Sequence, residues 1–152
     1  MILERPCILL HKGTSIVSKL IKWQTRGAYS HASIWIPEAN KQIEAREFAN
    51  VQMSFVEDWD IVDAFEVPQM TKEQWMIAIG FCKHHLGQKY DWWAIARFIT
   101  RSPGVENQKW FCSELVFEAL KRSGVNLLRS IPSWKVSPAM LGYSPLLVNY
   151  KK

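Results

Sequence analysis

Short runs of hydrophobic residues, several of them alternating with polar ones, predict strands in the first half of the chain. The run "CILLHKG" (7–13) predicts a buried strand that ends at a glycine, and "HASIWI" (31–36) predicts a second strand. After the tight connection "PEANK", "QIEAREF" (42–48) is expected to return antiparallel to the second strand. Two further strands are predicted at "VQMSFV" and "IVDAFEV". Between the first two strands, "TSIVSKLIKWQTRG" (14–27) has the apolar spacing of a helix that Gly27 ends.

A helical period replaces the strand pattern after residue 70. It predicts three helices, at 71–87, 91–100 and 111–124. Thr71 and Gln74 form a capping-box pattern at the start of the first of them. The tail has a short helix after Ser137 and a final strand near 146–149. Because strands come first, helices follow and no linker separates them, we expect one α+β domain over residues 1–152.

Charge is distributed unevenly along the 152 residues, whose net charge is +5. Residues 1–30 contain five Lys or Arg and one acid, whereas residues 31–70 contain two and eight. A basic segment of this kind suits an anionic surface such as nucleic acid, lipid headgroups or a wall polymer. Solvated surface charge explains it as well, because no basic run exceeds two residues. No aromatic–basic motif of a nucleic-acid reader is present, so we expect no nucleic-acid partner.

The three cysteines and the first residues indicate the compartment and argue against a metal. Three cysteines without paired spacing do not form a disulfide framework. The apolar run near the start is too short for a signal peptide or a membrane span, so a cytoplasmic protein is expected. A zinc site built on His31 and Cys112 would lack any close-spaced ligand pair, and we expect neither a metal nor another cofactor.

Cys112 opens the predicted helix of "FCSELVFEAL" on its apolar face. The unpaired N–H groups and the dipole of a first helical turn favour an anion, which lowers the pKa of a thiol. A buried cysteine is more often a small apolar side chain, however, and Cys7 and Cys82 are interpreted in that way. The helix alone therefore leaves the role of Cys112 open.

His31 is the best candidate for a base that would serve this cysteine. It shares one face of its predicted strand with Ser33 and Trp35, a mixture that is natural beside a site and unusual in a core. Glu44 lies within the partner strand, and its carboxylate would hold the imidazole if the hairpin register brings them together. Glu47 is favoured if the register slips by one residue, and a solvent-facing Glu44 is the third alternative.

These segments resemble the circularly permuted members of the NlpC-type papain-like cysteine hydrolases. "SHASIWI" and "QIEA" (30–36 and 42–45) match the hairpin of that family with its base and orienting residue, "KYDW" (89–92) matches its tyrosine segment, and "FCSELV" (111–116) matches its nucleophile helix. The order is rotated relative to ordinary members, and Glu114 stands where the family has glycine. The resemblance implies an antiparallel sheet packed against helices, with the cysteine-bearing helix near the C-terminus.

The resemblance also implies roles for individual residues. Cys112 would be the nucleophile of an amide or peptide hydrolase, His31 its base and Glu44 the orienting residue. The oxyanion and substrate would meet Tyr90, Ser113 and Trp35, together with the backbone at the start of the last helix. Candidate substrates are a bacterial cell-wall peptide, another peptide or a lipid amide. The alternatives are a lipid-directed acyltransferase or esterase and a catalytically silent binding scaffold, and the sequence does not indicate an oligomeric state.

Overall fold

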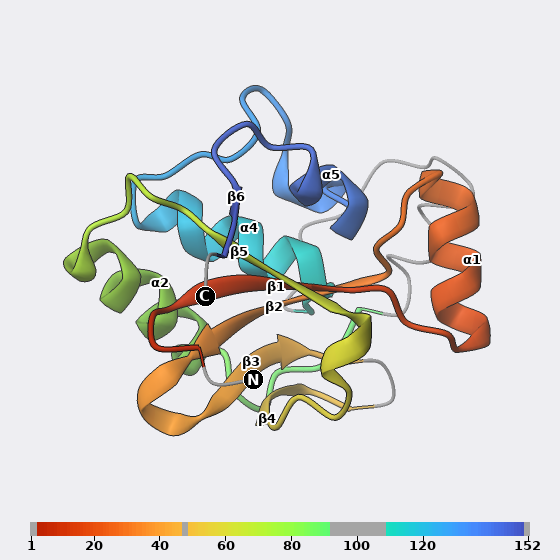
Figure 1. Ribbon diagram of the computed structural model, residues 1–152, viewed down its shortest axis with the longest axis horizontal. Helices are drawn as coiled ribbons and strands as arrows, with labels where there is room; N and C mark the ends of the chain where they lie inside the picture. Colours follow the sequence, from red (N-terminus) through yellow and green to blue (C-terminus); the bar gives the residue numbers. More distant parts are fainter. Residues whose placement is uncertain (1–2, 47–48, 92–108, 151–152) are drawn as a thin grey trace.

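A six-stranded antiparallel sheet forms the centre of the protein in this computed structural model, which describes residues 3–46, 49–91 and 109–150 (Figure 1). The strand order is β4-β3-β2-β1-β5-β6, and every neighbouring pair is antiparallel. The strands are β1 (Cys7–His11), β2 (His31–Ile36), β3 (Lys41–Ala45), β4 (Val51–Ser54), β5 (Val62–Glu66) and β6 (Val148–Asn149). The helices are α1 (Ile16–Thr25), α2 (Lys72–His84), α4 (Cys112–Arg122) and α5 (Pro138–Gly142). Short 3₁₀ turns lie at Pro37–Ala39, Trp59–Ile61 and Ser133–Lys135.

The alternation of side chains along the strands separates two faces of the sheet. One face is aliphatic and packs with α2 and α4 into the main core, to which Ile8, Ile34 and Ile43 belong. The other face is divided. Near Cys7 and Trp35 it carries a small apolar cluster, and near His11 and His31 it is polar. This division places a polar site at one end of the sheet, where β2 begins and β1 ends.

The helix ends follow the capping signals of the sequence closely. Thr71 caps α2, and both hydrogen bonds of its capping box with Gln74 are present. The end of α1 differs from the prediction, because Arg26 and not Gly27 adopts the left-handed conformation that ends it, with a φ of 50°. Gly27 is needed for close packing, since a Cβ there would lie 2.1 Å from the Cβ of Ala139.

The remaining elements of the described chain agree with the sequence prediction. The helix after Ser137 and the final short strand are both present, and the last long helix begins at Cys112. The helix expected at 91–100 lies almost entirely outside the described residues. None of the described helices is both long and apolar enough to cross a membrane.

Candidate active site

The start of β2 brings His31 against Glu44 of β3. The Nε2 of His31 donates a hydrogen bond to Glu44 Oε2 over 2.6 Å, and the two groups form an ion pair. The carboxylate side chain is 3% exposed and the imidazole 22%. The hairpin register explains the contact, because Trp35 lies opposite Gln42, and continuing this register places Glu44 on the face that carries His31.

Cys112 lies at the first position of α4, which packs against β2. It is 1% exposed, and it lies close enough to His31 for its charge and hydrogen bonding to raise the pKa of the imidazole. Since Nε2 of the imidazole is occupied by Glu44, the nitrogen that faces the sulfur is Nδ1. A sulfur from late in the chain and a carboxylate from its early hairpin therefore contact opposite ends of one imidazole ring.

The two neighbours of His31 control its protonation. Burial by itself would lower the pKa of the imidazole, but the charge and hydrogen bond of Cys112, followed by those of Glu44, outweigh burial and raise the pKa to about 10. Burial would likewise raise the pKa of Glu44, yet the hydrogen bond and charge of His31, with a contribution from Ser54, lower it to about 2. The ring is therefore an imidazolium beside a carboxylate at neutral pH.

A chain of hydrogen bonds supports Glu44 from behind. Ser54 Oγ donates to Glu44 Oε1 over 2.7 Å, and Gln52 Nε2 adds a longer contact of 3.4 Å to the same oxygen. Gln42 Nε2 in turn donates to Ser54 Oγ over 3.2 Å. Both carboxylate oxygens thus accept hydrogen bonds, and this fixes the orientation of the group that orients His31.

A second histidine, His11, joins this chain from the neighbouring strand. Its ring packs edge-on against that of His31, with ring centres 5.0 Å apart. Ser33 Oγ donates its only proton to Gln42 Oε1 over 2.7 Å, so its contact of 3.1 Å with His11 Nε2 requires an N–H on the imidazole. Burial, followed by the charge of His31, lowers the pKa of His11 to about 3. His11 is therefore neutral, with Nε2 protonated.

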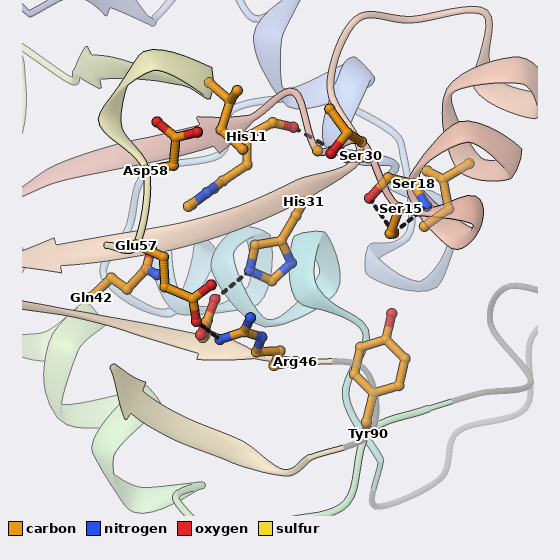
Figure 2. A pocket seen from close by; sticks show the side chains of 15 residues that line it. His11, Ser15, Ser18, Ser30, His31, Gln42, Arg46, Glu57, Asp58 and Tyr90 are labelled. Carbon is orange, nitrogen blue, oxygen red and sulfur yellow. Dashed lines mark hydrogen bonds and ion pairs between the residues drawn. The ribbon is translucent and has the colours of Figure 1, made fainter. Parts of the chain in front are cut away.

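A pocket of about 290 Å³ opens onto this pair of histidines (Figure 2). Tyr90 borders it and points its hydroxyl into the pocket, and the pairing of residues 89–91 with Trp110 holds the tyrosine there. The opposite wall comes from the loop before α1 and the start of that helix. Polar side chains dominate the lining: His11, Thr14, Ser15, Ser18, Ser30, His31, Gln42, Glu44, Arg46, Glu57 and Asp58.

Two residues expected beside the substrate have other roles. The Ser113 side chain is fully buried and donates to the carbonyl oxygen of Val136 over 2.6 Å, so it holds α4 to the chain before α5. Trp35 is 2% exposed, donates to the carbonyl oxygen of Leu3 and belongs to the small apolar cluster away from the pocket. Neither side chain is among those that line the pocket, and contact of these two residues with substrate stays a prediction. Glu47, the alternative to Glu44, lies outside the described residues.

The sequence analysis did not identify His11, Gln42 or Ser54 as parts of the site. His11 lies within the predicted strand at 7–13, and no acidic residue close to it in sequence marks it as part of a site. Its position depends on the β1–β2 register, which sets His11 directly opposite His31. A signal was present in the polar residues of β3 and β4 that alternate with apolar ones, because such residues had to share the face of His31.

Fold and site together define an α+β protein with a papain-like fold, in which the strands that carry the histidine precede the helix that carries the cysteine. A similar solved structure is that of the metalloprotein yiiX from Escherichia coli O157:H7, described as a DUF1105 protein. The two chains share 18% identity with a TM-score of 0.75, and the match covers 100% of this chain and 98% of the other. No protein-family model and no curated protein matches the sequence.

These comparisons correct the family that the motifs suggested. The chain was expected to be a circularly permuted NlpC-type hydrolase, but no family model supports that membership, and the similar structure is described as a DUF1105 metalloprotein. At 18% identity the likeness extends to the fold alone. The short motifs around His31 and Cys112 were therefore sufficient to predict the fold but not to predict the family.

Proposed function

We propose that the protein is a thiol hydrolase that cleaves an amide bond through an acyl-enzyme. One observation carries this proposal: the imidazole of His31 lies between two groups. The buried carboxylate of Glu44 holds it on one side, and Cys112 is its neighbour on the other. A thiol, an imidazole and an orienting acceptor in this order are the parts of a nucleophilic triad. Cys112 lies in the first turn of α4, where backbone N–H groups without partners inside the helix can stabilise negative charge.

The reaction follows from the positions of these groups. The sulfur of Cys112 attacks the carbonyl carbon, and the negative charge that forms on oxygen is stabilised by the N–H groups at the start of α4 and by the hydroxyl of Tyr90. His31 gives its proton to the leaving nitrogen, the C–N bond breaks, and an acyl thioester remains on Cys112. The neutral imidazole then takes a proton from water, whose oxygen attacks the thioester. The C–S bond breaks, which releases the acid and restores the free sulfur beside the imidazolium.

The lining of the pocket favours a polar acyl group over a hydrocarbon chain. Serine, threonine and charged side chains surround it, and Ile21 and Ile61 are its aliphatic members among the described residues. Arg46 and Glu57 at its edge pair with each other over 2.8 Å. A peptide, including a peptide of the bacterial cell wall, fits this lining better than a lipid amide does.

A metal-dependent reaction does not follow from the likeness to a metalloprotein. In residues 3–46, 49–91 and 109–150, no group of three or more His, Cys, Asp or Glu side chains is arranged to hold a metal ion. Both carboxylate oxygens of Glu44 already accept hydrogen bonds, from His31, Ser54 and Gln52. We therefore propose no step through a metal and expect a chelator such as EDTA to leave hydrolysis unchanged.

Alkylation with iodoacetamide tests the proposed nucleophile. All three cysteines are free and buried, but burial raises the pKa of the Cys82 thiol to about 12 and also raises that of Cys7. We expect modification below pH 8 to fall on Cys112 alone, and the C82S variant to react as the parent protein does. The H31N variant should react several-fold more slowly at that pH. Equal labelling with and without His31 would contradict the proposal and support a silent scaffold.

Trapping the acyl group would identify the substrate. The parent protein is incubated with a cell extract and quenched in acid, and the peptide that contains Cys112 is examined by mass spectrometry. A mass increase on this cysteine that is absent from C112A gives the acyl group directly. An unmodified cysteine under conditions in which iodoacetamide reacts with it would argue against an acyl-enzyme.

A further inference from the structure

Helix α1 exposes a stripe of large apolar side chains to solvent. Ile16 is 86% exposed, Leu20 36% and Trp23 71%. These residues are spaced by four and three positions, so they share one face of the helix. The adjoining face carries Val17 and the buried Ile21, which pack onto the core. The apolar arc of the helix is thus wider than the part that packs onto the core.

Basic residues border this stripe. Lys19 and Arg26 are exposed, and neither forms an ion pair with an acidic side chain of the described chain. Lys22 lies on the same flank and donates to the carbonyl oxygen of Lys12. No acidic residue occurs within α1. An apolar stripe beside unopposed positive charge is the pattern of a helix that lies on an anionic lipid surface.

Among the described residues, no element covers the exposed stripe of α1, so a large flat partner could reach it. The helix stands at one end of the molecule, beyond the ends of β1 and β2 (Figure 1). Its first turn also borders the pocket through Ser15 and Ser18. A surface that contacts α1 therefore lies next to the pocket entrance.

We infer that α1 docks the protein on an anionic lipid bilayer, with its apolar stripe at the level of the headgroups and its basic flank on the lipid phosphates. A second copy of the chain suits the stripe less well, because a stable protein interface takes roughly 20 residues from each side and the stripe consists of three. The exposed indole of Trp23 suits the boundary between headgroups and acyl chains. This inference concerns binding and does not depend on the proposed hydrolase.

Flotation with lipid vesicles tests whether α1 binds an anionic bilayer. The full chain carrying C112A is mixed with vesicles of phosphatidylcholine containing about 30% phosphatidylserine or with pure phosphatidylcholine. We expect the fraction bound to the anionic vesicles to be greater, with a partition coefficient on the order of tenfold higher, and to fall as salt is added. The I16S/L20S/W23S variant should lose about tenfold or more, and K19Q/R26Q should lose the preference for anionic lipid.

Matched control variants on α2 distinguish binding through α1 from nonspecific binding by any exposed apolar or basic side chain. M76S/I77S removes two exposed apolar side chains from α2, 57% and 51% exposed, and K72Q/K83Q removes two exposed lysines from the same helix. Both should bind as the parent does, and unchanged thermal unfolding would show that the α1 variants are folded. No binding to anionic vesicles would overturn the inference, as would equal losses in the two sets of variants. Dimerisation of the parent that I16S/L20S/W23S abolishes would assign the stripe to a second copy and also overturn it.

Discussion

The protonation of two neighbouring histidines is the main chemical feature of this protein. Two charged rings in contact would repel each other, and the structure avoids this by giving them different partners. His31 has an acidic neighbour on one side and a thiol on the other, while the Nε2 of His11 contacts the neutral hydroxyl of Ser33. The pKa of the first ring is raised to about 10 and that of the second is lowered to about 3.

This difference predicts that neither ring titrates near neutral pH. Nitrogen NMR of the histidine side chains should show one permanently charged ring and one permanently neutral ring between pH 5 and 8, assigned to His31 and His11. The H31N and H11N variants would make the assignment. A midpoint near the ordinary histidine pKa for either ring would contradict the interpretation.

Removing the charge of Glu44 should move the alkaline limit of activity. In the proposed reaction His31 acts as a proton donor, so the rate falls as the imidazolium loses its proton with a pKa of about 10. Glu44 raises that pKa, and E44Q removes the carboxylate charge while keeping an oxygen acceptor. The descending limb of kcat/KM should therefore shift to lower pH, with a loss of roughly tenfold or more at the optimum.

The control for this variant is E38Q. It makes the same charge change at an exposed residue of the turn between β2 and β3. Its pH profile should match that of the parent. An alkaline limb of E44Q that coincides with the parent's would mean that Glu44 does not set the protonation of His31.

At the scale of elements, the end of α1 depends on a close approach that only glycine permits. A Cβ at position 27 would meet Ala139 Cβ at 2.1 Å, whereas a Cβ at Gly80 within α2 would meet nothing within 4 Å. We expect G27A to destabilise the protein by about 1–3 kcal/mol through overpacking. G80A should stabilise it by about 0.5–1 kcal/mol, because alanine is the better helix former. Urea unfolding of the two variants measures both effects, and equal midpoints would contradict the packing argument.

Most elements could be predicted from the sequence because each rests on a local signal. Alternation along β2, the capping box at Thr71 and the apolar face behind Cys112 are all read within one segment. The predicted end of α1 was wrong by one residue. Gly27, which was predicted to end the helix, is required for close packing against Ala139, more than a hundred residues away in sequence.

The site was only partly predictable because it spans four strands. The order His31, Glu44 and Cys112 was visible as a resemblance. The link from His11 through Ser33, Gln42 and Ser54 to Glu44, however, exists only once β1 to β4 are in register. The burial of Trp35 in the small apolar cluster could not be predicted for a related reason. Its face of β2 is polar at one end and apolar at the other, and alternation alone does not show where that change falls.

At the scale of the whole molecule, the two histidines should make folding stability peak near pH 6.5, the ordinary histidine pKa. His31 has a raised pKa, so its stabilisation is complete below pH 6.5 and is lost as the pH rises through about 10. His11 has a lowered pKa, so below pH 6.5 its imidazole is protonated in the unfolded chain but neutral in the folded protein. Folding stability therefore falls as the pH drops from 6.5 toward about 3. Glu44, with its pKa lowered to about 2, adds a further loss below pH 4.5.

Urea unfolding of the parent, H11N and H31N between pH 4.5 and 9 separates these contributions. Each proton difference gives a slope of up to about 1.4 kcal/mol per pH unit. We expect H11N to flatten the acid side between pH 4.5 and 6.5 and leave the alkaline side steep, because His31 still titrates there. H31N should flatten the alkaline side and also reduce the acid slope, since the charge of His31 is the second cause of the low pKa of His11. An acid slope unchanged in H31N would mean that burial alone keeps His11 neutral, and that the two rings do not control each other's charge.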